Sequence, residues 1–251
     1  MTKEIKMANV IEVDAKKLTS FLSKINLGGL LNECILQSGE GFVSASSIDP
    51  SNIIFLSIQE DVDISPLGNL GLGDIGIISK FISECPKENQ EKLKLVKDSD
   101  RLIIDHSGIQ MKYLLTNVAL ITTSVTDGKI TDIMEKCEYS FTLTKDIKDS
   151  FLSAINILKS KTASLVVNKG QVMLTGGLSN EHTFTLPLIP LEEGSAVDNF
   201  VCSFYADYIK AVFSVLDFEE DDNPIIRFSP GYPMIVQEAN NYWAVFPLTL
   251  D

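Results

Sequence analysis

The sequence predicts an α+β fold made of two similar halves, in which helices pack on antiparallel sheets. Two short matches share an offset of 130 residues: FLSKIN at 21–26 matches FLSAIN at 151–156, and Lys80 in GIISKFIS matches Lys210 in DYIKAVFS. One such match could arise by chance, but two matches in register favour a duplicated unit; amphipathic helices of similar composition are the alternative explanation. Each half also mixes two helical patterns with many short strands, unlike the strict alternation of a dinucleotide-binding fold.

In the first half, apolar residues at helical spacing predict helices over 14–26 and 74–84. Leu18, Phe21 and Ile25 fall on one face of the first helix, and Asp14 is suited to cap its N-terminus. Pro86 is expected to end the second helix. Strands are predicted between turns such as Asp49-Pro50, over 33–37, 41–46, 52–59, 92–97, 101–106 and 110–116.

The second half repeats this plan, with helices predicted over 144–161 and 205–216. Its strands are predicted over 139–143, 164–168, 171–175, 182–187, 200–204, 225–228, 234–238 and 242–247, with Gly176-Gly177 as a turn. Residues 122–138 show little periodicity and are interpreted as a connector, and residues 189–199 as a loop. The predicted domains are therefore 1–121 and 139–251, joined by 122–138.

Composition excludes several classes of protein. The chain has 251 residues, 45% hydrophobic and 22% charged, which excludes a disordered polymer. It has no apolar run long enough to span a membrane and no apolar signal core near its start, so an intracellular protein without membrane contact is expected. The four cysteines are far apart, which indicates reduced structural thiols and no metal site; no cofactor is expected.

Positive charge is concentrated in the predicted helices, although the chain as a whole is acidic. The net charge is −13, yet the four helices carry nine lysines against six acids, which leaves −16 for the rest. Lysines that merely solubilise an exposed face explain any single helix. All four together favour a shared, mildly positive surface that contacts phosphates without reading sequence. The residues assigned to this DNA-binding surface are Lys16, Lys17, Lys24, Lys80, Lys145, Lys148, Lys159 and Lys210.

Three segments resemble the DNA sliding clamps of the proliferating cell nuclear antigen (PCNA) type, including archaeal and phage clamps. The most specific is GFVSASSIDPSNIIFLSI at 41–58, in which a strand leads through the Ile48–Ile53 loop into a second apolar strand. AKKLTSFLSKI at 15–25 resembles the first clamp helix with its paired lysines. The ending PMIVQEANNYWAVFPLTLD at 233–251 resembles the C-terminal clamp strands.

The resemblance implies a processivity factor for DNA polymerase and no enzymatic activity. Clamp domains carry two helices on curved antiparallel sheets, and three two-domain copies close a homotrimeric ring around duplex DNA. The implied partners are the polymerase, the clamp loader and further copies of the chain, in the nucleus of a eukaryote or the cytoplasm of an archaeon or phage-infected cell. Subunits would join by pairing the strand near 110–116 with the strand near 182–188 of the next copy, which also hides exposed edges.

The family docks partner peptides in an apolar pocket beneath the connector. Carried over to this chain, the pocket residues would be Ile48, Asn52, Ile53, Ile130, Ile133, Met134, Pro233, Phe246 and Pro247. Two departures bear on which peptide is accepted. The last segment lacks the usual Ala-Pro-Lys tail, and Asn52 stands where histidine is frequent.

Three other functions fit parts of the sequence. A clamp-like subunit of a hetero-trimeric, checkpoint-type ring would share every feature above. An enzyme is disfavoured, because the Gly68–Gly73 run lacks a phosphate-loop motif and the acidic residues of 217–222 lack the spacing of a calcium loop. A plain interaction protein would share the fold without a lysine-lined channel.

Overall fold

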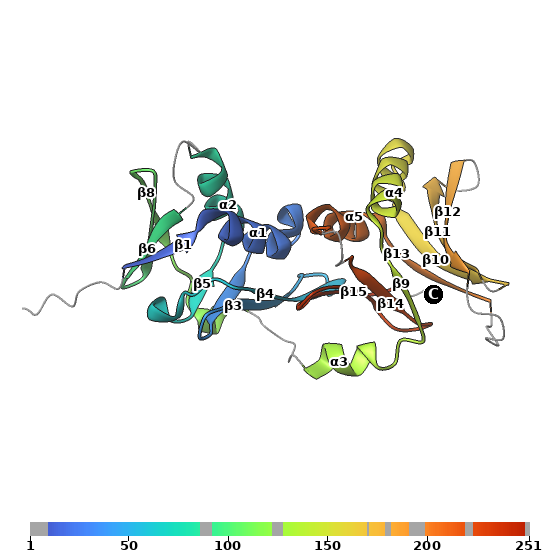
Figure 1. The fold of residues 1–251 in the computed structure, drawn as a ribbon, viewed down its shortest axis with the longest axis horizontal. Coiled ribbons are helices and arrows are strands. Elements are labelled where there is room, and N and C mark those ends of the chain that lie inside the picture. The colour runs from blue at the N-terminus through green and yellow to red at the C-terminus, as the bar shows by residue number, and fades with distance from the viewer. Residues whose placement is uncertain are drawn as a thin grey trace, which may run out of the picture. The chain divides into compact units, whose positions relative to one another are not determined.

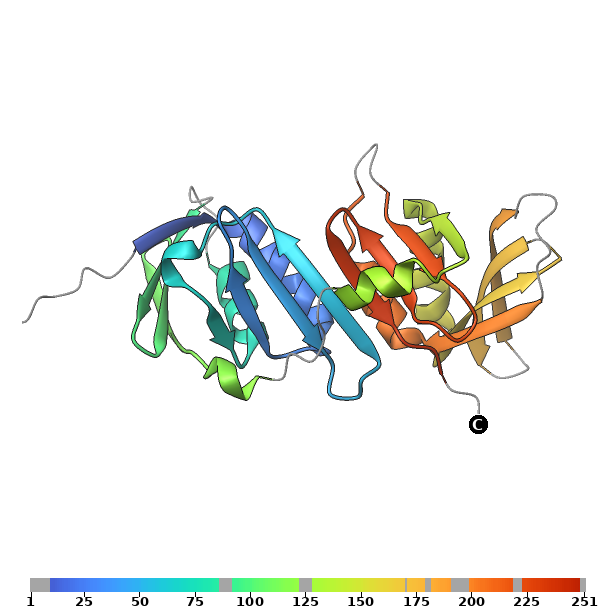
Figure 2. The same ribbon diagram turned by 90° about the horizontal axis from the view of Figure 1, so that it is seen from below.

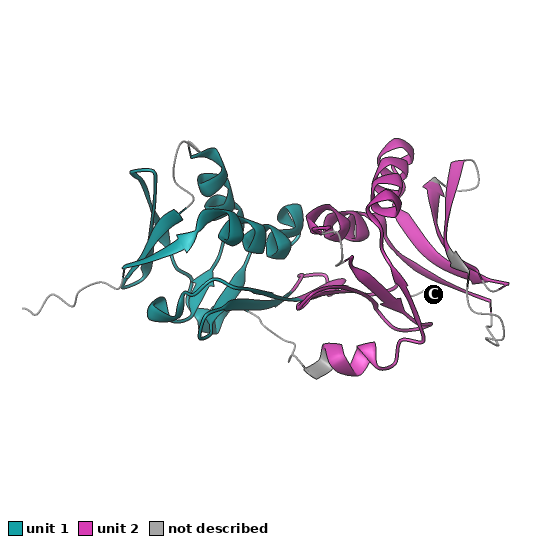
Figure 3. Ribbon diagram, in the orientation of Figure 1, with its two compact units in different colours: residues 1–47, 57–124 teal, residues 48–56, 125–251 magenta. Residues whose placement is uncertain are grey.

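The computed structural model describes residues 10–85, 92–121, 128–169, 171–178, 182–190, 199–218 and 223–248. The chain forms two compact units, shown in Figure 3: unit 1 holds residues 1–47 and 57–124, and unit 2 holds 48–56 and 125–251. The segment 48–56 thus joins unit 2, although the predicted boundary placed it in the N-terminal domain. Its backbone is bound there, since the Phe246 N–H donates to the Ile53 carbonyl at 2.8 Å.

Unit 1 contains two antiparallel sheets and two helices, α1 (Ala15–Asn26) and α2 (Ile75–Glu84), which pack against each other (Figure 1). One sheet has the order β1-β6-β7-β8, and the other runs β5-β2-β3-β4. The strands are β1 (Val10–Asp14), β2 (Cys34–Ser38), β3 (Val43–Ile48), β4 (Ile54–Glu60), β5 (Leu70–Leu72), β6 (Lys92–Asp98), β7 (Arg101–His106) and β8 (Ile109–Leu114). Single 3₁₀ turns lie at Leu27–Gly29, Ser65–Leu67 and Val118–Leu120.

Both helices of unit 1 begin at the aspartates that the sequence indicated. The Asp14 carboxylate accepts from the Lys17 N–H at 2.9 Å, and that of Asp74 accepts from the Ile77 N–H at 3.2 Å. Helix α1 ends where Leu27 turns left-handed, and α2 ends at Cys85, whose extended backbone is typical of a residue before proline. Strands β1 and β5 were not predicted; β5 has only three residues, which are too few to show a clear alternation.

Unit 2 repeats the element order of the first half: strand, helix, four strands, helix, three strands. Its elements are β9 (Tyr139–Thr142), α4 (Lys145–Leu158), β10 (Thr162–Asn168), β11 (Gln171–Leu178), β12 (His182–Pro190), β13 (Phe200–Tyr205), α5 (Ala206–Val215), β14 (Ile225–Phe228), β15 (Met234–Glu238) and β16 (Asn241–Val245). One sheet has the order β12-β11-β10-β13; the other continues from β4 as β16-β15-β14-β9. The matched Phe21 and Phe151 are both fully buried, so the repeat preserves core positions. The predicted α+β architecture is confirmed.

Three local predictions for unit 2 were wrong. Helix α4 ends at Leu158 because Lys159 turns left-handed and the Ser160 hydroxyl bonds to the Gly177 backbone. Gly176 and Gly177 therefore lie within β11 and do not form a turn. The supposedly irregular connector contains helix α3 (Gly128–Met134), whereas 122–127 and the acidic residues 219–222 lie outside the described residues.

Substituting Gly71 with alanine is expected to destabilise unit 1 by about 2 kcal/mol. A Cβ on Gly71 would lie 2.1 Å from the Thr116 carbonyl oxygen. That oxygen belongs to the backbone and cannot easily move away, because the Thr116 N–H donates to the Gly71 carbonyl at 2.9 Å. Gly76→Ala is the control, because its Cβ would meet only the Asp74 side chain at 3.3 Å, and a change under about 1 kcal/mol is expected. Urea denaturation measures both, and equal stabilities would contradict the prediction.

Candidate partner-docking site

The loop Asp49–Ile53, here called the docking loop, folds around a buried carboxylate. Asp49 is 2% exposed, and its Oδ1 accepts from the N–H groups of Ile53 and Ile54 at 2.6 and 2.7 Å. Its Oδ2 accepts from the Ser51 N–H at 3.0 Å and from the Tyr208 hydroxyl on α5 at 2.9 Å. The carboxylate thus satisfies three loop amides and allows Asn52 to take a positive φ of 56°.

Helix α3 covers an apolar cluster on strands β4, β16 and β15, on the face of the sheet opposite α5 (Figures 1 and 2). Ile130 is 4% exposed and packs with the buried Phe55, Ile235 and Ala244. The partly buried residues around this cluster are Ile48, Ile133, Met134, Cys137 and Tyr242. The connector is therefore anchored to unit 2 by its own apolar face.

The structure brings many of the predicted docking residues together. Ile48, Ile130, Ile133 and Met134 share the cluster beneath α3. Ile53 and Phe246 are joined by the backbone hydrogen bond above; Phe246 is 37% exposed and Pro247 half-buried. Asn52 is exposed at the tip of the docking loop, whereas Pro233 is buried.

Sequence reasoning missed Phe55, Ile235, Tyr242, Ala244 and Cys137 as members of this cluster. Strand alternation signals the pair Ile235 and Ala244, which lie opposite each other in register. Helix α3 was also missed, although the apolar residues at 130, 133, 134 and 137 follow the i, i+3, i+4, i+7 spacing that could have revealed it.

The eight predicted DNA-contacting lysines differ in exposure. The exposed members are Lys16, Lys17, Lys80, Lys145 and Lys159. Lys210 is half-buried and donates to Asn156 Oδ1 on α4 at 2.6 Å. Lys148 lies near Asp149 and over the Phe218 ring, with 15% of its side chain exposed. Lys24 is only 6% exposed, which makes it the least accessible of the eight to a phosphate.

Strands β8 and β12 each form one end of a sheet. The Leu115 N–H donates to the Asp100 carbonyl at 2.8 Å, so by antiparallel alternation the backbone groups of Lys112 and Leu114 point to the free edge. Leu114 is exposed. Pro187 lies within β12, where proline is tolerated because an edge strand has a side that needs no N–H donor.

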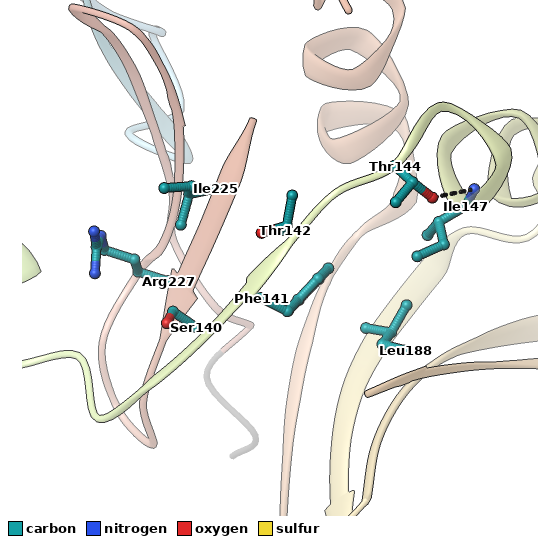
Figure 4. A pocket seen from close by; sticks show the side chains of 8 residues that line it. All are labelled: Ser140, Phe141, Thr142, Thr144, Ile147, Leu188, Ile225 and Arg227. Atoms are coloured by element: carbon teal, nitrogen blue, oxygen red, sulfur yellow. Dashed lines mark hydrogen bonds between the residues drawn. The ribbon is translucent and has the colours of Figure 1, made fainter. Parts of the chain in front are cut away.

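A hollow of about 510 Å³ lies beside β9 (Figure 4). Its lining residues are Ser140, Phe141, Thr142, Thr144, Ile147, Leu188, Ile225 and Arg227. None of them belongs to the predicted docking or DNA-contacting sets, so this hollow is separate from both.

Burial is the main cause of the raised pKa values of the thiols and tyrosines, whereas hydrogen bonds from Ser65 lower the pKa of the exposed Asp63. Burial raises the pKa of the Cys34 thiol to about 12 and also raises the pKa of Cys137, which the nearby Arg227 partly opposes. The four cysteines are free thiols. Among the described residues, no three His, Cys, Asp or Glu side chains are grouped to hold a metal ion. Within the same residues, no helix has the length and apolar character needed to cross a membrane.

Comparison with solved structures shows that this is the fold of PCNA-type sliding clamps. PCNA from Thermococcus kodakaraensis matches with a TM-score of 0.68 and 13% identity over 95% of this chain and 99% of its own. A. fulgidus PCNA, bound to the C-terminal region of FEN-1, matches at 0.72 and 14% over 98% and 100%. DNA polymerase III subunit beta from Borrelia burgdorferi matches at 0.69 and 15%, over all of this chain and 67% of its own. No family model and no curated protein matches the sequence.

Proposed function

We propose that this protein is a DNA sliding clamp, a processivity factor that encircles duplex DNA as a ring of three copies and tethers DNA polymerase. The observation that carries the proposal is the clamp fold, built from two repeats that leave β8 and β12 as open edges. A ring retains DNA by topology and needs no tight contact. A tethered polymerase gains effective concentration at the primer end without itself changing.

The repeat supports closure by self-association. By element order, β12 in the second half corresponds to β4 in the first, and β8 corresponds to β16. Strands β4 and β16 are neighbours in one sheet. The sheet-end strands β12 and β8 thus correspond to two strands that pair within the chain, which favours a head-to-tail contact between β8 of one copy and β12 of the next.

A hetero-trimeric ring is the second candidate, because PCNA2 and PCNA3 from Sulfolobus tokodaii, which form a complex with each other, have the same fold. Light scattering on the purified chain separates the two. A mass of three chains supports the homotrimer, and a monomer at micromolar concentration supports a ring with other subunits. Any mass other than that of three chains contradicts the homotrimeric ring, because three two-domain copies are needed to supply six clamp domains.

The exposed helix lysines would supply weak, non-specific attraction to phosphates, which permits sliding. Phe246, Ile53, Asn52 and the edge of the α3 cluster would receive a partner peptide, as the FEN-1 C-terminal region is bound in the archaeal complex. The proposed role is therefore that of a scaffold that holds DNA and a partner protein.

Replacing Lys17, Lys80 and Lys145 with alanine is expected to weaken DNA association in a salt-dependent way. Each lost phosphate contact lowers the slope of log affinity against log salt by about 1, so a decrease of about 3 is expected. The matched control replaces Lys92, Lys94 and Lys136, which are exposed on a strand and after α3, with the same loss of charge. Binding to a closed-circular duplex at several salt concentrations measures both triples, and equal slopes would remove the helix lysines from the DNA surface.

A further inference from the structure

A side-chain hydrogen bond from Tyr208 ties the docking loop to helix α5. The Tyr208 hydroxyl donates to Asp49 Oδ2 at 2.9 Å, across 159 residues of sequence. We propose that Tyr208 is a positioning residue for partner docking: its hydroxyl fixes the carboxylate around which the docking loop folds, and thereby the presentation of Asn52 and Ile53. The proposal rests on the proposed function for the identity of the ligand, but the effect on loop structure stands apart from it.

The loop depends on this bond because its other contacts to the carboxylate are local. Ser51, Ile53 and Ile54 donate to Asp49 from within the same six residues. Among the described residues, the hydroxyl of Tyr208 is the donor to this carboxylate that comes from outside this local segment. Without it, one carboxylate oxygen would lose a partner in a site from which water is excluded, and unmet buried acceptors are costly.

Helix α5 provides a rigid support for that hydroxyl. Ile209, Val212 and Phe213 are fully buried, and Lys210 bonds to Asn156 of α4. Burial, followed by the neighbouring Asp49, raises the pKa of Tyr208, so the hydroxyl keeps its proton and remains a donor at neutral pH. The helix thus holds the donor still while the loop arranges itself around the acceptor.

The first test is amide hydrogen exchange in Tyr208→Phe, which removes the hydroxyl and keeps the ring. The amides of Ile53 and Ile54 are expected to exchange on the order of tenfold faster, with no change in β10 or β11. Tyr205→Phe is the matched control, since Tyr205 is an exposed tyrosine at the start of the same helix, and wild-type exchange is expected. Unchanged exchange at Ile53 and Ile54 in Tyr208→Phe would overturn the proposal.

The second test is calorimetric binding of a synthetic peptide with the sequence of the FEN-1 C-terminal region. Tyr208→Phe is expected to bind it about fivefold more weakly than wild type and Tyr205→Phe, because the loop must be ordered on binding. Equal affinities for wild type and Tyr208→Phe would overturn the role in docking. If wild type binds no peptide, the docking part of the proposed function fails, and the exchange experiment alone decides whether Tyr208 positions the loop.

Discussion

If the proposed ring forms through β8, Lys112→Pro is expected to yield monomers, with self-association weakened at least about 100-fold. The Lys112 N–H points to the free edge of β8, so proline removes a donor that the proposed contact with a neighbouring copy would use, and it leaves the β7–β8 hydrogen bonds in place. The pyrrolidine ring of the introduced proline also obstructs a strand that approaches from that side. Sedimentation velocity over a range of concentrations measures the change, and loss of retention on circular DNA should accompany it.

Lys112→Ala is the matched control for that experiment. It removes the same exposed charge but keeps the N–H, so it should assemble as the wild type does. A proline variant that keeps the wild-type mass would show that β8 is not the subunit contact. Circular dichroism on both variants separates a failure to assemble from a failure to fold.

Asp49→Ala is expected to lower the free energy of unfolding by about 3–4 kcal/mol. It leaves the N–H groups of Ser51, Ile53 and Ile54 and the Tyr208 hydroxyl without their acceptor. Ile54 is fully buried, so water cannot replace the carboxylate there. For a chain of this length the melting temperature should fall by about 10 °C, as measured by calorimetry.

Asp61→Ala provides the comparison for Asp49→Ala. Asp61 is exposed and lies in a bend soon after β4, so the same change in charge should alter stability by less than about 0.5 kcal/mol. If the two variants melt together, the carboxylate of Asp49 does not organise the docking loop.

Regular periodicity made most of the fold predictable from sequence. Helices α1, α2, α4 and α5 were found because their apolar residues repeat at helical spacing, and Asp14 was suited to cap the first of them. Elements failed where the signal was short or ambiguous. Strand β5 has three residues, and the glycines inside β11 look like a turn until their partners Thr183 and Phe184 are known.

The sequence named several residues of the candidate docking site, but it did not predict how the chain packs around them. The resemblance supplied Ile48, Ile53 and Phe246 as candidates. It gave no sign that α3 would pack over Phe55 and Ile235, or that Lys24 would be buried. Burial depends on what the rest of the chain places against a side chain, which a local pattern does not contain.

The sequence by itself determined the repeat, because the two matches can be read directly from the residues. It also determined the four main helices and most of the strands, because these follow from interactions between residues a few positions apart. Only the tertiary structure decided that 48–56 belongs to unit 2, that Tyr208 reaches Asp49, and which lysines stay exposed. The physical reason is one of range. The apolar spacing of a helix or strand can be recognised within a short stretch of sequence. A hydrogen bond between residues 159 positions apart forms only after packing has brought them together.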